Sequence, residues 1–386
     1  MKSTLVLLGT LLALTSSIAQ MALPAQAEPG SEFEVPDTPA AMEKLRQEYL
    51  TQKAEMEKSM RLSAPLFFED QHYLARIPFF LPSAGKHDFS SYYNQLKAPN
   101  VTTLNLPEAL RKLDKTEQIK QARTLDLKGL DFGWMKPLLD YDHFNFTRIE
   151  SNQALLQKMP YALPVLMQFP DFMLLRQWAR LRLLQALNTG EMAQAARESR
   201  QLALLMLNSE SLIGSMVAVE MLRDESQIFK EWKVSLPGWE PMSEETLMRA
   251  RRTLRATPGF FMVQRTPADL FKQLSQDPQA RVGLCAGMAE GASTLMLHAL
   301  DPGERQAQTD EIAQFVKSQH CRVSHIEKLW AEPLVASEAF IKTNFSPAEY
   351  QRVKKDRAYR DAIYFLLESV SMPNFMGGYQ EPQPAN

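Results

Sequence analysis

The sequence predicts an all-α fold, and two observations support this prediction. Hardly any segment alternates between polar and apolar residues with the period of two that a half-buried strand requires, and β-branched clusters are scarce. Between residues 160 and 232, segments with helical apolar spacing are separated by turns of only a few residues. Helices joined in this way are antiparallel neighbours. We therefore predict an array of antiparallel helical hairpins, arranged as an α-solenoid or as an irregular helical bundle.

The first 27 residues have the features of a secretory signal peptide. Lys2 gives a positive start, an apolar run extends from Leu5 to Ile18, and Ala25-Gln26-Ala27 matches the A-x-A cleavage pattern. We expect cleavage before Glu28, and hence a periplasmic or secreted mature chain. Because residue 28 is not cysteine, the site lacks the lipid attachment point of a bacterial lipoprotein. The style of the leader favours a Gram-negative host.

Composition narrows the function classes. Hydrophobic residues form 45% of the chain, which is enough for a substantial core. The 43 Lys and Arg residues stand against 45 Asp and Glu residues. This balance argues against a general nucleic-acid-binding protein, because phosphate contacts demand a basic surplus. After the leader no apolar run reaches the roughly 18 residues that span a bilayer, so we expect no transmembrane segment in the mature chain.

Changes in composition divide the chain into five regions. They are a signal peptide at 1–27, a linker at 28–36, an N-terminal helical and aromatic-rich irregular region at 37–159, a helical-hairpin domain at 160–371 and a flexible tail at 372–386.

The N-terminal region begins with one long predicted helix. Thr38 is its expected N-cap, Pro39 takes the first helical position, and the helix ends near Leu62. From Pro65 to Pro107, aromatic clusters cut by prolines predict short helices and irregular connections. Further short helices are expected at 106–113, 116–124 and 132–140.

The hairpin domain contains the clearest helices, predicted at 172–187, 191–207 and 211–232. Gly190 lies in the first turn, where it can adopt a positive φ at the helix end. A helix capped by Ser243 should run to about Ala256, where Pro258-Gly259 stops it.

Two capping boxes and five more helices complete the hairpin domain. The first box, Thr266 to Asp269, should open a short helix. Further helices are predicted at 279–300, 304–330 and 334–342. The second box, Ser346 to Glu349, should open a last long helix that ends near Val370.

About thirty residues, from Trp178 to Asn208, resemble a tetratricopeptide hairpin. In that family a glycine-containing turn links two helices, and an alanine five residues later lets the second helix pack closely; Gly190 and Ala195 match. Trp178 falls one position from the aromatic site of the first helix, Arg182 and Leu183 replace its Leu-Gly pair, and Ser199 stands at the aromatic site of the second. No second copy follows at a period of about 34 residues. The resemblance implies a binding or scaffolding surface.

The chain has two cysteines, Cys285 and Cys321. In an exported protein such a pair most simply forms one disulfide. The alternative is two buried free thiols.

Several short motifs carry ligand or catalytic residue types. Glu69 with His72 and Asp140 with His143 have the spacing of di-iron helix ligands, but the first pair lies in proline-broken sequence and the second begins with Asp. His320, Cys321 and His325 offer zinc donors, although an i, i+5 spacing directs the two imidazoles away from each other on a helix. Ser83 to Lys86 matches the S-x-x-K motif of serine β-lactamases, but the S-D-N and K-T-G motifs of that family are missing. Asp131 to Gly133 matches the metal-binding D-F-G motif of protein kinases, but the glycine-rich loop and H-R-D motif are missing. We interpret all of them as chance matches and predict no metal site and no catalytic residue.

Glu220 and two basic stretches complete the candidates. Glu220 is mid-helix among apolar residues, so burial would raise its pKa and suit it to act as a general acid; the alternative is that it points outward or pairs with Arg223. The stretches Arg249–Arg255 and Arg352–Arg360 suit either an anionic partner or a solvated helix face.

We expect an exported, non-enzymatic helical binding or scaffold protein of the bacterial envelope, with a protein or peptide partner and no cofactor. The alternative is a periplasmic enzyme or a cofactor- or metal-binding protein with its site where helices converge. Its first residues to test are Glu220, His298, His320 and His325. A further possibility is peripheral membrane contact through the 347–370 helix.

Overall fold

The computed structural model describes residues 35–36, 38–77, 87–98, 103–158, 167–209, 211–261, 266–276 and 332–371. Within these ranges the chain forms helices and turns and no strand, with two isolated bridges between Asp88 and His143 and between Leu236 and Trp239. The predicted all-α class is confirmed. No helix in the described ranges is long and apolar enough to cross a membrane.

Several predictions fall on residues outside the described ranges. They are the signal peptide with Ala25, Ala27 and Glu28, the Ser83–Lys86 motif, the helices at 279–300 and 304–330, the residues Cys285, Cys321, His298, His320 and His325, and the tail at 372–386.

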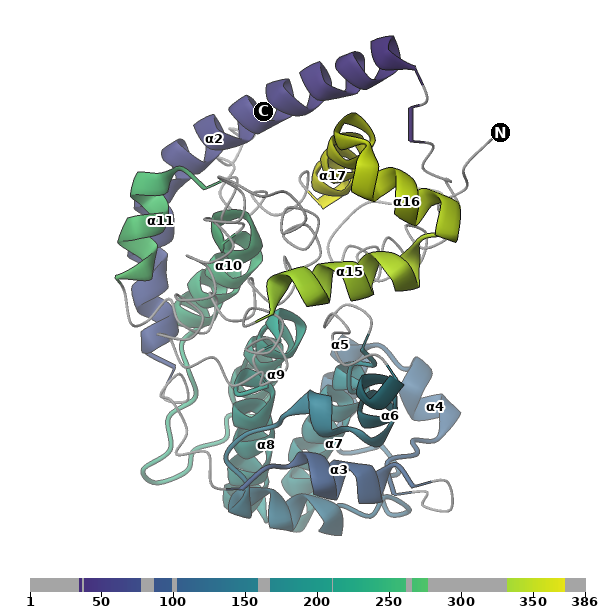
Figure 1. Cartoon of the computed structure of the whole chain (residues 1–386). Coiled ribbons are helices and arrows are strands. Elements are labelled where there is room, and N and C mark those ends of the chain that lie inside the picture. The colour runs from purple at the N-terminus through teal and green to yellow at the C-terminus, as the bar shows by residue number, and fades with distance from the viewer. Residues whose placement is uncertain are drawn as a thin grey trace. The chain divides into compact units, whose positions relative to one another are not determined.

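The chain divides into two compact units (Figure 1). Unit 2 consists of residues 69–153 and 168–254, and unit 1 contains the remainder. Each unit therefore joins segments that are distant in sequence. Three helices contribute residues to both units: α2 (Pro39–Ala75), α6 (Glu150–Lys158) and α10 (Glu244–Phe261).

Unit 2 is built around three consecutive helices that pack against one another. They are α7 (Phe172–Thr189), α8 (Met192–Leu207) and α9 (Leu212–Glu231), close to their predicted bounds. Asp171 and Ser211 accept backbone N–H groups at the starts of α7 and α9. Gly190 ends α7 with φ 77°, as predicted.

Short elements surround these three helices. They are α3 (Ser90–Leu96), α4 (Glu108–Lys112), α5 (Lys115–Lys120), the 3₁₀ helix η1 (Gly133–Asp140) and the 3₁₀ turn η2 (Phe146–Arg148). The helix predicted at 132–140 is thus 3₁₀ rather than α. Helix α3 lies in the range Pro65 to Pro107, where short helices were predicted, whereas α6 was not predicted. Trp178 anchors this layer, because its ring packs on Phe132 and Trp134 and its indole N–H donates to the Leu104 carbonyl at 3.0 Å.

Two predicted helix ends are wrong for the same reason. Helix α2 continues through Pro65 to Ala75, and α10 continues through Pro258 to Phe261. A proline removes one backbone hydrogen bond and strains the preceding turn. In both helices the buried stripe extends past the proline, to Phe67 and Leu74 in α2 and to Phe260 in α10, so side-chain burial outweighs the loss.

Unit 1 also contains α11 (Ala268–Ser275), α15 (Pro333–Asn344), α16 (Pro347–Lys355) and α17 (Arg357–Ser371). The predicted last long helix is therefore two helices, divided at Asp356, which has an extended backbone. The capping box of Ser346 and Glu349 is confirmed. The box predicted at Thr266 is wrong, because the Thr266 hydroxyl donates to the Phe260 carbonyl at 2.6 Å and Asp269 pairs with Arg61 instead.

Candidate functional site

Three carboxylates are buried on the helices α8 and α9 of unit 2. Glu198 lies on α8, and Asp224 and Glu225 lie on α9. Burying an ionised carboxylate without a partner costs several kcal/mol or more. Each of the three is paired with an arginine from another helix, so these pairs connect α7, α8 and α9 to one another.

Glu198 pairs with Arg182 of α7. The Arg182 Nε atom lies 2.7 Å from the Glu198 carboxylate, and both side chains are buried. The same guanidinium reaches Glu191 at 3.1 Å and Gln185 at 2.8 Å. Gln194 donates to the second oxygen of Glu198 at 2.8 Å, so both carboxylate oxygens are satisfied.

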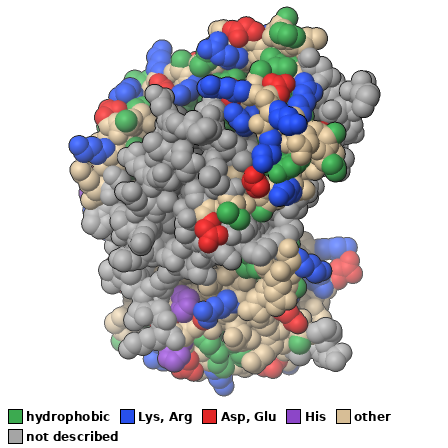
Figure 2. Space-filling view, viewed as in Figure 1, with side chains coloured by type: hydrophobic (Ala, Val, Ile, Leu, Met, Phe, Trp, Pro, Cys, Tyr) green, Lys and Arg blue, Asp and Glu red, His purple; other side chains and the backbone are tan. Residues whose placement is uncertain are grey.

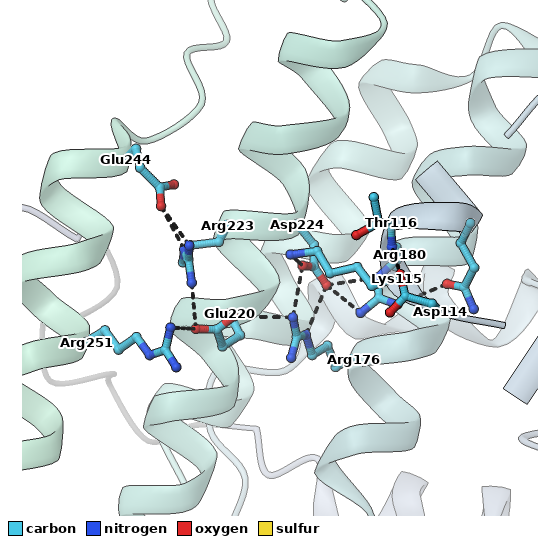
Figure 3. A network of polar contacts seen from close by, with 11 residues as sticks. Asp114, Lys115, Thr116, Arg176, Arg180, Glu220, Arg223, Asp224, Glu244 and Arg251 are labelled. Atoms are coloured by element: carbon cyan, nitrogen blue, oxygen red, sulfur yellow. Dashed lines mark hydrogen bonds and ion pairs between the residues drawn. The ribbon is translucent and has the colours of Figure 1, made fainter. Parts of the chain in front are cut away.

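Asp224 receives three cations (Figure 3). Arg176 and Arg180, one turn apart on α7, donate to it at 2.9–3.0 Å, and the Lys115 ammonium of α5 lies 2.6 Å away. The Nη1 atom of Arg180, which does not contact Asp224, donates a hydrogen bond to the Gln118 side-chain oxygen at 3.0 Å. Burial works to raise the pKa of Asp224, but the hydrogen bonds from Arg176 and the charges of Arg180, Arg176 and Lys115 hold it below its ordinary value.

For Glu225, the next residue, the effect of burial exceeds the effect of its partners. Arg200 of α8 donates to it twice, at 2.8 and 3.1 Å, and the Trp239 indole N–H donates at 2.8 Å. Burial raises the pKa of Glu225 above its ordinary value, because one arginine and one neutral donor do not offset the loss of solvation. The pKa values of these two adjacent buried acids therefore shift in opposite directions because different numbers of cations surround them.

Glu220 is neither deeply buried nor unpaired. Its side chain is 19% exposed and lies within 3.1–3.3 Å of Arg176, Arg223 and Arg251, which come from α7, α9 and α10. The predicted alternative, pairing with Arg223, is confirmed. Arg223 also holds Glu244 at 2.7 Å. Glu220 therefore joins α9 to α7 and to α10 through ion pairs.

The E-x-x-H and D-x-x-H residues do not converge into a ligand set. Glu69 pairs with Arg249 at 2.8 Å while His72 is exposed. Asp140 is exposed, and His143 bonds Asp142 at 2.6 Å instead. In the part of the chain that the structure describes, no three His, Cys, Asp or Glu residues are grouped to hold a metal ion.

The kinase-like triplet has a local structural role. Asp131 accepts the Gly133 N–H at 2.7 Å and so forms the turn that opens η1.

The two basic stretches carry acidic partners of their own. In the first, Arg249 and Arg252 both reach the buried Asp70, and Arg251 reaches Glu220. In the second, Lys354 pairs with Glu338 at 2.8 Å. On the face drawn in Figure 2, Lys and Arg side chains lie among Asp and Glu side chains around α16 and α17.

Unit 1 contains a shallow groove of about 400 Å³ between α2 and α11. It is lined by Arg61, Ala64, Pro65, Phe68, Leu270 and Gln273. On the same helix, Leu62 is 72% exposed and Leu66 is also exposed. Exposed leucines near a partly apolar groove are typical of surfaces that contact another molecule.

Sequence reasoning missed the network around Asp224, although its signal was present. Arg176 and Arg180 are the polar residues of a helix that is otherwise apolar nearly all round, and they are spaced i, i+4. Glu220 and Asp224 have the same spacing on a helix that follows two short turns later. Residues spaced i, i+4 lie on the same face of a helix. Two arginines with this spacing on one helix and two carboxylates with this spacing on a neighbouring helix therefore predict ion pairs between the helices.

Comparisons with known proteins give no family for this chain. No protein-family model, no curated protein and no solved structure matches it. The functional argument therefore rests on the residues described above.

Proposed function

We propose that this chain is an exported, non-enzymatic helical binding or scaffold protein of the bacterial envelope. One observation carries the proposal. The buried carboxylates Glu198, Asp224 and Glu225 are held by arginines of other helices. These charged groups serve to join α7, α8 and α9, and the surface of the rigid body they form is the part available to a partner.

Two further features support the proposal. The leader and its Ala25-Gln26-Ala27 site favour export, and the turn at Gly190 with close packing at Ala195 agrees with a hairpin array used for recognition. The partner is a protein or a peptide. The exposed Leu62 and Leu66 of α2 give it an apolar surface to contact.

Export is tested by fractionation of the native host followed by mass measurement of the intact protein. The expected product is found in the periplasm or medium and begins at Glu28, with Cys285 and Cys321 joined. A cytoplasmic protein that retains all 27 leader residues contradicts the proposal.

Partner binding is tested by a photo-crosslinking residue placed at Leu62, with Lys44 on the same helix as the matched control. Both side chains are exposed, but only Leu62 lies beside the groove. We expect one protein or peptide to crosslink at Leu62 and not at Lys44, and to bind the purified chain saturably. Identical products at both positions, or turnover of a substrate by the purified chain, contradict a binding protein.

A further inference from the structure

The ion-pair network around Glu220 and Asp224 contains more positive than negative charge. Its cations are Lys115, Arg176, Arg180, Arg223 and Arg251. Its carboxylates are Glu220, Asp224 and Glu244. Asp114, which precedes Lys115, accepts the backbone N–H of Thr116 at 2.7 Å and so opposes the positive end of α5. The network itself therefore holds a surplus of two positive charges.

This surplus is held where water screens it poorly. Arg176 and Arg180 are mostly buried, and they repel each other because they lie one turn apart on α7. Charges in such surroundings interact far more strongly than in bulk water. An added anion would lower the free energy of the folded network.

Two arginines of the network keep donors that are not used within it. The Nη1 atom of Arg176 and the Nε and Nη2 atoms of Arg251 have no hydrogen-bond partner among the described residues. Arg251 is 34% exposed, and Arg176, Arg223 and Arg251 surround the Glu220 carboxylate in Figure 3. These unused donors belong to two different helices, α7 and α10, and both arginines contact the same Glu220 carboxylate.

We propose that the Arg176–Arg251 side of this network binds a small phosphate-bearing anion, either inorganic phosphate or a soluble phosphate monoester. A phosphate monoester carries a charge of about −1.5 to −2 at neutral pH and strong acceptor oxygens, which matches the surplus of two. Guanidinium forks bind phosphate in a bidentate manner. This ligand class goes beyond the proposed function and depends neither on export nor on a protein partner.

The test is isothermal titration calorimetry of the purified mature chain at about pH 7.5, above the second phosphate pKa of about 6. Inorganic phosphate, glycerol 3-phosphate and acetate are compared at matched ionic strength. We expect one saturable site for both phosphates and binding of acetate that is at least about tenfold weaker, equivalent to one charge-assisted hydrogen bond. No saturable heat with either phosphate, or equal binding of acetate, overturns the proposal.

Variants test the location of the site. Arg251→Gln should weaken phosphate binding about tenfold or more, whereas Arg148→Gln, which removes an exposed arginine paired with Asp88 elsewhere in unit 2, should leave it unchanged. Equal affinity in the two variants overturns the assignment. Arg223→Gln, which removes the third guanidinium group around Glu220, provides the same comparison if Arg251→Gln does not fold.

A last arm distinguishes a soluble ligand from a lipid headgroup. The chain is sedimented with phosphatidic acid vesicles and with neutral vesicles. Binding to phosphatidic acid vesicles without binding to glycerol 3-phosphate overturns the proposal of a soluble ligand.

Discussion

The α7–α9 helices of unit 2 and the outer helices of unit 1 use the same charged residue types in opposite ways. In unit 2, Arg182–Glu198 and Arg180–Asp224 are buried pairs between helices. In unit 1, Arg61–Asp269 and Lys354–Glu338 lie on the surface. Breaking a buried pair leaves an uncompensated charge away from water, while an exposed partner is simply rehydrated. Ion pairs of similar length therefore differ greatly in how much stability is lost when one partner is removed.

The contrast extends to the cores of the two units. Among the described residues of unit 1, aromatic rings pack on one another, with Tyr49 stacked on Phe365 at 4.5 Å and Phe67 packed on Phe260 at 4.2 Å between ring centroids. Unit 2 also buries aromatic rings, such as Trp178 on Phe132, but between α7, α8 and α9 buried arginine side chains share the interior with leucine and alanine. An aromatic core requires burial alone, whereas the arginine-containing core also requires one partner for each charge.

The largest expected effect in this comparison comes from Arg182→Met. The substitution leaves Glu198 buried without its cation, so the free energy of unfolding should fall by about 4 kcal/mol. Urea denaturation followed by circular dichroism measures the change. The double variant Arg182→Met/Glu198→Leu should recover most of the loss, because no buried charge then remains.

The matched control for this prediction is Glu191→Gln. Glu191 bonds the same guanidinium at 3.1 Å, but its side chain is largely exposed. Its removal should cost less than about 1 kcal/mol. A loss of stability as large as that of Arg182→Met would show that solvent exposure does not determine how much stability is lost when an ion pair is broken.

The next effect, about 3 kcal/mol at neutral pH, is expected for Asp224→Asn, which removes the carboxylate shared by three cations. The folded pKa of Asp224 lies below its unfolded value, so its stabilisation is complete above the unfolded pKa and is lost as the pH falls through the folded pKa. The stability difference between wild type and Asp224→Asn should therefore shrink below about pH 4. Urea denaturation across this pH range measures it, and a constant difference contradicts the assignment.

Glu225→Gln should show the opposite pH dependence. The folded pKa of Glu225 lies above its unfolded value, so protonation stabilises the folded chain as the pH falls toward the unfolded pKa of about 4.3. The stability of the wild type relative to Glu225→Gln should therefore increase as the pH falls from 7 toward about 4.3. The same series of urea denaturations at different pH values tests both Asp224 and Glu225. The same pH trend for both residues would contradict the argument that the number of surrounding cations determines the direction of each pKa shift.

The sequence predicted the bounds of α7, α8 and α9 better than the ends of α2 and α10. The bounds of α7, α8 and α9 follow from helical apolar spacing and from short turns, including the one at Gly190. These signals are local, so they are readable without the partner helices. The ends of α2 and α10 were mispredicted, because the burial that carries each helix past a proline depends on residues distant in sequence, such as the Phe67–Phe260 contact.

The candidate site was predictable only in part, for a related reason. Glu220 and its possible partner Arg223 lie on one helix, so sequence reasoning found both. Lys115, Arg176 and Arg251 come from three other helices. The order in which those helices pack is not encoded in local spacing, and the charge surplus becomes visible only when they are brought together.

A smaller effect, about 1 kcal/mol, is expected for Ser346→Ala in unit 1. Ser346 accepts the Glu349 N–H at 3.3 Å, and the Glu349 carboxylate accepts the Ser346 N–H at 3.0 Å. The substitution removes the first bond and exposes an N–H of α16 to water, which limits the cost. Thermal denaturation measures the change. Ser346→Asp, which keeps an acceptor at the same position, should restore most of the stability.

The smallest effect is expected for Arg61→Gln, although this pair has favourable geometry. Arg61 donates to both oxygens of Asp269, at 3.0 and 3.2 Å. Both side chains are more than half exposed, at 55% and 65%, so water and salt replace each partner when the other is removed. We expect no measurable change in the midpoint of thermal denaturation, at low or at high salt. A clear fall in the midpoint that high salt suppresses would mean that the Arg61–Asp269 pair stabilises the fold as a buried pair does. The contrast between the two units would then depend on the geometry of the ion pairs rather than on their exposure.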